Sequence, residues 1–390
     1  MTGPSGSSGG ADIAVVLGTR PEIIKLAPIV RALGERARLI WTGQHYDPNL
    51  ADLHFDGAGL AMPVEQLRGV GGERRVDQII GVLTGVSRLV EGDRPRAVVV
   101  QGDTNTTNAA AQAAHYAGVP VVHVEAGLRS WDRAMPEEIN RMIVGVVADL
   151  HCCATAGNAE HLRAAGVPDA AIVVTGNTIV EATLATLPGR AEQDELLASY
   201  HLTDGKFVLA TVHRPENVDD ASALEAVLAG LAALPWPVVL PLHPRTAQRI
   251  ESFGLGGLAA QLRLVPPIDH RSFLALAARA RILVSDSGGV QEEVTILKKP
   301  LVVVRRSTER PEAVTAGFAR MASPAGIVDA VSIMAAPDVA ARLARLPCPF
   351  GDGRAGVRIA DATRALAGGA APGGRGASAE QPSGVFSPPY

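Results

Sequence analysis

The chain has 390 residues, of which 47% are hydrophobic and 19% are charged, and its formal net charge is −4. This length and composition are typical of a globular protein with two or three domains, and they exclude disorder for the bulk of the chain. With 36 basic and 40 acidic residues and no dense run of Lys and Arg, we expect no binding to nucleic acid or to an anionic membrane surface.

The three cysteines, Cys152, Cys153 and Cys348, have neither metal-ligand nor CxxC spacing, which fits buried thiols in a reducing compartment. No signal-peptide pattern begins the chain, and no apolar run reaches about 18 residues. We therefore expect a cytoplasmic protein that is not inserted in a membrane. Residues 1–10 and 368–390 are rich in Gly, Ala, Pro and Ser and are predicted to be disordered.

Short apolar, β-branched runs alternate with helical stretches along the middle of the chain. The runs in the first half are 12–17, 38–42, 97–101, 119–124, 149–153 and 171–175. The runs in the second half are 206–212, 237–242, 261–266, 281–285 and 300–304. This alternation predicts an α/β fold with two Rossmann-like, doubly wound parallel sheets that face each other across a cleft.

The strand pattern pauses between residues 182 and 204, where the chain is polar and helical. We therefore expect an N-terminal Rossmann-like domain at 11–185 and a C-terminal, nucleotide-binding Rossmann-like domain at 186–352. A helix at 353–367 is expected to cross back onto the first domain.

Most of the unusual polar residues directly follow a predicted strand. In an open parallel sheet, ligands bind beyond the carboxyl ends of the strands, where helix N-termini point their amides into the crevice. We therefore expect one interdomain cleft that binds a ligand with several polar groups. The polar residues that follow the predicted strands are Arg20, Gln44, His45, Asp103, Glu125, His213, His243, Asp286 and Arg305.

The segment 285–289 reads Ser-Asp-Ser-Gly-Gly and precedes a helical run. Backbone N–H groups in such a turn can hold a phosphate against the helix dipole, and Glu293 on the first turns can accept two ribose hydroxyls. The alternative is an N-cap at Ser287 with Glu293 compensating the dipole. The pattern is neither GxxxxGK[ST] nor GxGxxG, so a nicotinamide cofactor is not indicated.

Residues 18–25 form a second strand, tight turn and helix start, with a Pro near the first helical turn. Arg20 is placed to approach a phosphate or a carboxylate. Glu22 and Lys25 also fit an ordinary i,i+3 surface pair.

Four acidic residues in the first half have both a catalytic and a structural interpretation. Asp103 follows a buried strand and is either a reactive carboxylate or the N-cap of the next helix. Glu125 ends a buried strand, where a carboxylate needs a partner, and this favours an acid/base role. Glu137 and Glu138 begin a helix, where dipole compensation and an i,i+4 pair of Glu137 with Arg141 compete with a role in the cleft.

His213 ends a strand and opens a polar loop, where an imidazole can donate to a phosphate or carry a proton. No metal-ligand spacing such as HExxH and no GxSxG nucleophile motif occurs. Metal-dependent hydrolysis and acyl transfer are therefore disfavoured, and we expect no metal or other cofactor.

Taken together, several motifs resemble those of the non-hydrolysing UDP-N-acetylglucosamine 2-epimerase family. They occur in the family's order and span residues 13–350. The motifs are GTRPEIIK at 18–25, QGDT at 101–104, HVEAGLR at 123–129, PEEINR at 136–141, TGN at 175–177, SDSGGVQEE at 285–293 and TERPE at 308–312.

The resemblance implies a glycosyltransferase-B-like fold, a homodimer, a UDP-sugar substrate and reversible conversion of UDP-GlcNAc to UDP-ManNAc. In such enzymes, anti elimination of UDP gives a glycal, and syn re-addition follows with protonation of C2 from the opposite face. The resemblance also implies a place in polysaccharide biosynthesis. It implies catalytic roles for Asp103, Glu125, Glu137 and His213, and substrate binding by Arg20, Lys25, Ser287, Gly288, Gly289, Glu293 and Arg310.

Some bacterial members of the family bind UDP-GlcNAc as an allosteric activator beside the substrate. Gln44, His45, Glu138 and His243 are compatible with such a second site, whereas the segment 66–75 departs from the family's pattern there. The loop His-Arg-Pro-Glu-Asn-Val-Asp from His213 is also a variant. Three alternatives therefore stay open: a 2-epimerase of a modified sugar such as a diacetamido uronic acid, a glycosyltransferase of the same fold, and a non-catalytic sensor of nucleotide sugars.

Overall fold

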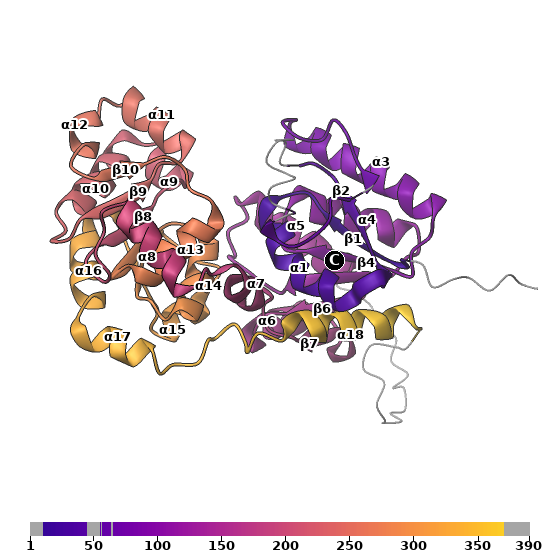
Figure 1. Cartoon of the computed structure of the whole chain (residues 1–390). Coiled ribbons are helices and arrows are strands. Elements are labelled where there is room, and N and C mark those ends of the chain that lie inside the picture. The colour runs from indigo at the N-terminus through magenta and orange to yellow at the C-terminus, as the bar shows by residue number, and fades with distance from the viewer. Residues whose placement is uncertain (1–10, 45–54, 56, 64, 370–390) are drawn as a thin grey trace, which may run out of the picture.

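The computed structural model describes residues 11–44, 55, 57–63 and 65–369. The elements form two lobes that lie side by side (Figure 1). In the described residues one sheet has seven parallel strands in the order β3-β2-β1-β4-β5-β6-β7, and the other has six in the order β10-β9-β8-β11-β12-β13. The ends predicted to be disordered lie outside the described residues, apart from Gly368 and Gly369.

The strands of the first sheet are β1 Ile13–Leu17, β2 Ala37–Trp41, β3 Glu65–Gln66, β4 Ala97–Gln101, β5 Val121–Ala126, β6 Leu150–Cys153 and β7 Ile172–Val174. Those of the second sheet are β8 Val208–Thr211, β9 Val238–Pro241, β10 Arg263–Val265, β11 Ile282–Ser285, β12 Leu301–Val304 and β13 Ala319–Ala322.

The α-helices up to the junction of the lobes are α1 Arg20–Leu33, α3 Arg75–Gly92, α4 Asn105–Tyr116, α5 Pro136–Val147, α6 Ala156–Ala164, α7 Ile179–Thr186 and α8 Arg190–Ser199. The later ones are α9 Pro215–Val218, α10 Ala221–Ala232, α11 Pro244–Ser252, α12 Gly256–Ala259, α13 His270–Arg279, α14 Gly288–Leu297, α15 Pro311–Thr315, α16 Ile327–Met334, α17 Pro337–Leu343 and α18 Ala355–Ala367.

The central strands are continuous apolar runs because helices cover both faces of each sheet. β1 reads IAVVL and β4 reads AVVVQ, and every residue of both strands is buried. All of the predicted strands are present, each within two residues of its expected ends. The expected fold of two doubly wound parallel sheets is therefore confirmed.

Two short edge strands were not predicted. β3 consists of Glu65 and Gln66, and β13 reads ARMA with only its first residue buried. Neither has the apolar, β-branched composition that marks a buried strand, because an edge strand needs only one neighbour to satisfy its backbone groups.

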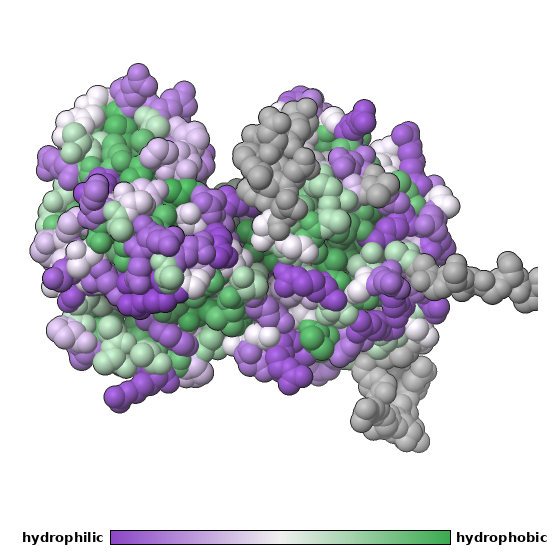
Figure 2. Space-filling view, in the orientation of Figure 1, coloured by the Kyte–Doolittle hydropathy of each residue, from purple (hydrophilic) through white to green (hydrophobic). Residues whose placement is uncertain are grey.

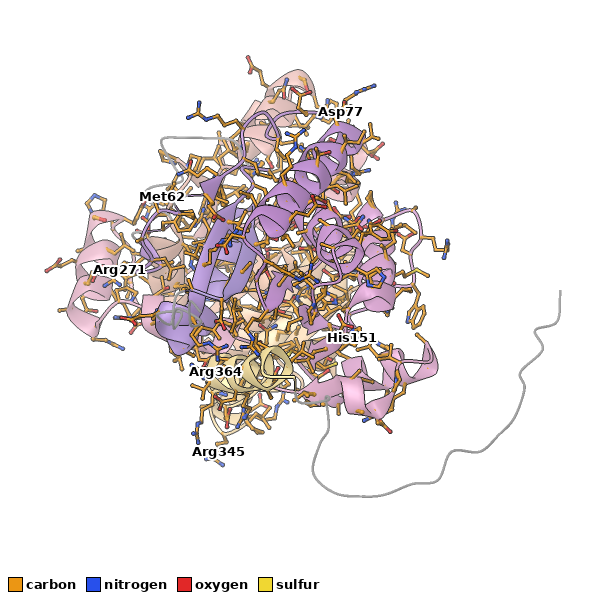
Figure 3. All side chains as sticks on the ribbon, turned by 90° about the vertical axis from the view of Figure 1, so that its right-hand side faces the viewer. Met62, Asp77, His151, Arg271, Arg345 and Arg364 are labelled. Carbon is orange, nitrogen blue, oxygen red and sulfur yellow. The ribbon has the colours of Figure 1, made fainter. Side chains whose placement is uncertain are left out.

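The last helix, α18, packs against the N-terminal lobe. Ile359 and Ala360 belong to the same apolar cluster as β1 and α1. Gly356 permits this close approach, because a Cβ at that position would lie 2.8 Å from the Cβ of Pro28. Arg364, labelled in Figure 3, donates to Asp361 and to the carbonyl of Ala32 on α1. The division of the chain near residue 185 stays our proposal, and α7 contacts helices of both lobes.

In each sheet the order of strands reverses at one point, between β1 and β4 in the first and between β8 and β11 in the second. The connections that follow these strands run in opposite directions and leave a crevice at the carboxyl edge, where ligands bind in open α/β sheets. A hollow separates the two lobes in the space-filling view (Figure 2). Within the described ranges no single helix is long and apolar enough to cross a membrane, although the bent pair 324–334 and 337–343 passes that test by length and composition.

Two histidines lie inside the first sheet. His123 on β5 and His151 on β6 are register partners, and each is 1% exposed; Figure 3 labels His151. The Nε2 of His123 lies 2.8 Å from the carbonyl oxygen of Gly102 and donates to it. Burial lowers the pKa of His123 to about 3 and that of His151 to about 4, so both rings are neutral at pH 7.

We predict that these rings make the fold sensitive to acid. The folded-state pKa of each lies below the ordinary value of 6.5, so the unfolded chain binds more protons below that pH. Stability should be full above pH 6.5 and fall as the pH decreases, with a slope that approaches about 1.4 kcal/mol per pH unit for each ring. Urea denaturation from pH 7 down to about pH 5 measures this slope.

His123→Gln should flatten the slope, because the amide keeps a donor for Gly102 but does not titrate. His115→Gln, which alters an exposed residue on α4, is the matched control and should keep the wild-type slope. An unchanged slope in His123→Gln would show that His123 is not held neutral in the folded protein.

Candidate active site

A cavity of about 500 Å³ lies between the two lobes, at the carboxyl edges of both sheets. One wall comes from the segments after β1 and β4, from Glu125 within β5 and from the start of α5. The other comes from the segment after β8, the start of α14 and the segment before α15. The charged and glycine residues that line the cavity are Lys25, Arg75, Gly102, Asp103, Glu125, Glu137, Arg141, Arg214, Gly288, Gly289, Glu309 and Arg310.

Glu125 lies inside β5 and does not follow it, which corrects the expected strand end at residue 124. The register of β5 against β6 shifts between Val124 and Ala126, and Glu125 has a φ of +62°. Such a bulge re-aims a side chain, and a left-handed conformation at a residue other than Gly or Asn is strained. Strain of this kind persists where the surrounding structure over-determines it, most often at functional sites.

Two cations and an amide surround the Glu125 carboxylate, which is 8% exposed. Its Oε2 lies 2.6 Å from Nζ of Lys25 and accepts from Nε2 of Gln101 at 2.8 Å. Its Oε1 lies 3.3 Å from Nη2 of Arg310, which belongs to the other lobe. The strained residue is therefore fixed by partners from α1, from β4 and from across the cavity.

One interpretation of the sequence placed Lys25 in a surface pair with Glu22, and the structure does not show this pair. Its Nζ lies between Glu125 and Glu292, at 2.6 and 3.0 Å. Burial disfavours the charged ammonium, but the two carboxylates outweigh burial and raise the pKa of Lys25. Lys25 is therefore a fixed positive charge.

Glu22 instead closes the turn between β1 and α1. Its Oε2 accepts from the backbone N–H of Gly18 at 3.0 Å and of Thr19 at 2.7 Å. Its Oε1 accepts from the hydroxyls of Thr104 and Thr107 on the segment after β4. Burial raises the pKa of Glu22. The contacts join the two segments that flank the crevice in the first sheet.

Asp103 is not the N-cap of α4, because Thr104 holds that position and accepts from the N–H of Thr107. The Oδ2 of Asp103 accepts from Nε and Nη2 of Arg141, at 2.9 and 2.5 Å. Arg141 also donates through Nη1 to Glu138, at 2.8 Å. Arg141 therefore pairs with Asp103 and Glu138 and not, as the competing interpretation had it, with Glu137, which lines the cavity.

Arg310 contacts three carboxylates. Its Nε lies 2.9 Å from Glu292, its Nη1 lies 2.5 Å from Glu309, and its Nη2 reaches Glu125. Burial disfavours its charge, but these carboxylates raise the pKa of Arg310. Burial also favours neutral Glu309, yet Arg310 and Arg305 lower the pKa of Glu309 to about 2. Arg310 and Glu309 are therefore both ionised at neutral pH.

The glycine turn at the start of α14 brings backbone close to the cavity. A Cβ on Gly288 would lie 2.8 Å from Nη1 of Arg310, whereas a Cβ on Gly289 would meet open space. Ser287 is the N-cap residue, but its side chain makes no capping hydrogen bond. The N–H groups of this helix start are therefore placed to bind an anion beside Arg310.

Arg20, Glu293 and His213 are not among the residues that line the cavity. Glu293 Oε1 lies 2.8 Å from Nε2 of His270, so it does not stand alone at the helix start. Burial lowers the pKa of Arg20. Burial also lowers the pKa of His213, although Asp286, 3.4 Å from its Nδ1, opposes this, and the ring is neutral at pH 7.

Three of the residues considered for a second site have contacts of their own in the structure. Gln44 lines the cavity, and its Oε1 accepts from the N–H and the hydroxyl of Thr106. Glu138 is 1% exposed and bound by Ser130 and Arg141. His243 caps α11 through its Nδ1 and does not line the cavity. His45 lies outside the described residues.

The sequence indicated only local pairs for Glu22 and Arg141 and no role for Glu292, whereas all three hold the site together. The capping-box pattern Thr19-x-x-Glu22 was a usable signal for Glu22. No local pattern marks Glu292, because its partners lie far away in the sequence, Asn177 by 115 residues. In the part of the chain that the structure describes, no group of three or more His, Cys, Asp or Glu side chains is arranged to hold a metal ion.

Comparison with known proteins places these observations in a family. Residues 31–364 match a family model described as UDP-N-acetylglucosamine 2-epimerase. A UDP-N-acetylglucosamine 2-epimerase of Methanocaldococcus jannaschii is 36% identical over 362 residues, covering 89% of this chain and 97% of the relative. A UDP-2,3-diacetamido-2,3-dideoxy-D-glucuronate 2-epimerase of Pseudomonas aeruginosa is 37% identical over 314 residues, covering 78% and 86%.

Solved structures agree with this relationship. The crystal structure of the M. jannaschii UDP-GlcNAc 2-epimerase in complex with UDP-GlcNAc and UDP has a TM-score of 0.79 and 35% identity, covering 90% of this chain and 98% of that one. The Neisseria meningitidis UDP-GlcNAc 2-epimerase bound to UDP-GlcNAc has a TM-score of 0.80 and 29% identity, with the same coverage.

We predict that Arg141→Met destabilises the fold by about 3–5 kcal/mol, because Asp103 and the buried Glu138 then both lose the guanidinium with which they pair. Urea denaturation measures the loss. Arg163→Met removes an exposed pair with Asp169 and is the control, which should leave the free energy of unfolding nearly unchanged. Equal effects in the two variants would contradict a structural role for the Arg141 pair.

Proposed function

The chain belongs to the UDP-N-acetylglucosamine 2-epimerase family, and we propose that it interconverts UDP-GlcNAc and UDP-ManNAc in the cavity between its lobes. The observation that carries this proposal is that Asp103, Glu125 and Glu137, from three separate segments, line one cavity together with Lys25 and Arg310. A cavity of about 500 Å³ falls within the size range of small-molecule sites.

The chemistry explains why both signs of charge are needed. The hydrogen on C2 of the sugar is not acidic, so the bond from C1 to the UDP oxygen must weaken as the proton leaves. A carboxylate takes the proton, the C–H electron pair forms the C1=C2 bond of a glycal, and UDP departs with the C1–O electron pair. In the return step UDP re-adds to C1 and a carboxylic acid protonates C2 from the opposite face, so no redox change occurs.

The cations meet the charge that develops on the diphosphate. Arg310, Gly288 and Gly289 line the part of the cavity that the second lobe supplies. The guanidinium and the two backbone N–H groups are fixed donors, and donors of this kind stabilise a departing anion. His213, neutral at pH 7, is proposed beside the diphosphate as a donor. Arg20 and Glu293 are proposed to bind the nucleotide, with Glu293 on the ribose hydroxyls.

The three carboxylates are proposed to act as one group around C2. Glu125 is held from one side by Lys25 and Gln101, and Asp103 is held by Arg141. Glu137 lines the same cavity at the start of α5. Proton transfer within such a cluster belongs to the group and not to one residue.

GlcNAc is the favoured sugar because the family description and the M. jannaschii relative name it, and that relative covers more of the chain than the diacetamido-glucuronate enzyme does. A glycosyltransferase of the same fold would need an acceptor and has no use for three carboxylates at one carbon. Incubation with UDP-GlcNAc in deuterated water separates these reactions. Deuterium at C2 of recovered UDP-sugar supports epimerisation, whereas sugar transfer with free UDP or unchanged protium contradicts it.

We predict that Glu125→Gln lowers turnover at least about 100-fold, because a positioned proton-transfer group is lost. UDP affinity should change only a few-fold, since the amide keeps the shape of the site. Glu225→Gln, on the exposed face of α10, is the control and should have wild-type turnover. A near-normal rate for Glu125→Gln would remove Glu125 from the mechanism.

We also propose that the enzyme is a cytoplasmic homodimer that supplies UDP-ManNAc for polysaccharide biosynthesis. Support for the cytoplasm comes from Cys152 and Cys153, which are buried free thiols. Support for a dimer comes from apolar side chains on α3 and α5, helices that both pack against α4. Val146 is 84% exposed and Ile80 is 56% exposed. Exposed large apolar side chains that gather on one surface can mark a contact with another protein chain.

We predict that Val146→Asp shifts the protein from dimer to monomer in sedimentation velocity, because a charge would be buried in the interface. Val328→Asp, on α16 of the other lobe, is a matched control and should stay dimeric. A monomeric wild type would contradict the proposal.

A further inference from the structure

Glu292 stands at the centre of the contacts between the lobes and has no place in the proposed chemistry. It lies on α14, is 1% exposed and does not line the cavity. Its Oε2 lies 3.0 Å from Nζ of Lys25, and its Oε1 lies 2.9 Å from Nε of Arg310. Both cations also contact Glu125. A buried carboxylate with these partners needs an explanation beyond filling the core.

The four side chains form a closed ring in which the charges alternate. Lys25 and Glu125 belong to the first lobe and are 2.6 Å apart, and Arg310 and Glu292 belong to the second and are 2.9 Å apart. Within the ring, the lobes are joined by Lys25 with Glu292 at 3.0 Å and by Arg310 with Glu125 at 3.3 Å. Each lobe therefore supplies one cation and one carboxylate, and the ring is neutral as a whole.

The position of Glu292 is fixed at the junction of the lobes. Its Oε1 also accepts from Nδ2 of Asn177, at 3.0 Å, in the segment that leaves β7. The N–H of Asn177 donates to the carbonyl of Phe350, in the segment that returns to the first lobe. Glu292 is therefore held where the segment after β7 meets the segment that returns to the first lobe. These contacts fix its position without substrate.

The contacts of Arg310 show how Glu292 limits the approach of a cation to Glu125. Glu292 holds its Nε and Glu309 holds its Nη1, so only Nη2 is left to face Glu125, at the longest distance of the ring. Without the charge of Glu292, Arg310 and Lys25 would both turn to Glu125 as their shared partner, since an uncompensated buried cation is costly. A carboxylate bound closely by two cations is a poor proton acceptor.

We propose that Glu292 is a positioning residue that holds Lys25 and Arg310 between two carboxylates, so that the two cations do not both close on Glu125 and its carboxylate stays available to the sugar. This inference rests on the proposed function. It assigns Glu292 an effect through Lys25 and Arg310, without contact with the substrate.

The test compares Glu292→Gln with Glu181→Gln. Glu181 lies on α7 near the same junction and accepts from the N–H of Gly356, with no cation in contact, so it is the matched control. UDP affinity is measured by calorimetry, and turnover is followed by UDP-GlcNAc conversion. For Glu292→Gln we expect turnover at least about 10-fold lower, the effect usual for losing the outer partner of a site residue.

UDP should bind Glu292→Gln at least as tightly as wild type, because the site then carries one more net positive charge beside the anionic diphosphate. Slower turnover with undiminished UDP affinity is not what general damage to the site produces, since damage weakens both. Wild-type turnover, or a parallel loss of turnover and UDP affinity, overturns the proposal. Glu181→Gln should match wild type in both measurements.

The pH profile gives a second readout. The charged groups that face Lys25 are Glu125, Glu292 and Arg310, and Glu292 is one of the two carboxylates that raise the pKa of Lys25. The basic limb of the turnover profile should therefore move to lower pH in Glu292→Gln and stay in place in Glu181→Gln. An unmoved basic limb counts against the proposal.

If Glu292→Gln does not fold, Glu292→Asp keeps the charge but is too short to reach both cations. We expect unchanged UDP affinity and turnover at least about 10-fold lower, and wild-type turnover in this variant overturns the proposal. Failure of the proposed function is distinguishable, because wild-type protein would then leave protium at C2 of UDP-GlcNAc in deuterated water. The comparison of UDP affinities would still test the role of Glu292.

Discussion

The site depends on the neutralisation of two buried cations by carboxylates from both lobes. Lys25 and Arg310 each lie between Glu125 and Glu292, and removing water from such charges costs several kcal/mol per ion unless partners repay it. Neither lobe alone supplies all the partners. The two buried cations are therefore neutralised only when the lobes are arranged as they are here.

The same contacts also explain why the strained backbone of Glu125 is tolerated. A φ of +62° at a glutamate, at a bulge in a central strand, is unfavourable by itself. Three hydrogen-bonding partners hold the side chain in return, and they aim its carboxylate at the cavity instead of into the sheet. Strain, ion pairing and access to the substrate therefore meet in one residue.

Much of this arrangement could be predicted from the sequence. Continuous apolar runs mark strands covered on both faces, and polar residues after them must gather at one sheet edge, which placed Asp103 and the Gly288 turn at the cavity. The resemblance to the family named the reaction and most of the residues. Two short edge strands escaped prediction because their composition is polar or mixed.

The pairing of charges could not be predicted. Glu137 and Glu138 both begin α5, and local spacing favoured Glu137 as the partner of Arg141, whereas the packing of α5 on α4 turns Glu138 inward and leaves Glu137 at the cavity. Glu292 and Lys25 are far apart in sequence, and only the folded arrangement of the lobes brings them together. Local propensity carries no information on contacts of this kind.

The most direct test of the account is a crystal structure of the protein with UDP-GlcNAc bound. The account predicts that C2 of the sugar lies within hydrogen-bonding reach, about 3 Å, of a carboxylate oxygen of Asp103, Glu125 or Glu137, with the other two around the same ring and Arg310 on the diphosphate. A sugar bound with its C2 away from all three carboxylates, or a diphosphate that does not contact Arg310, would contradict it.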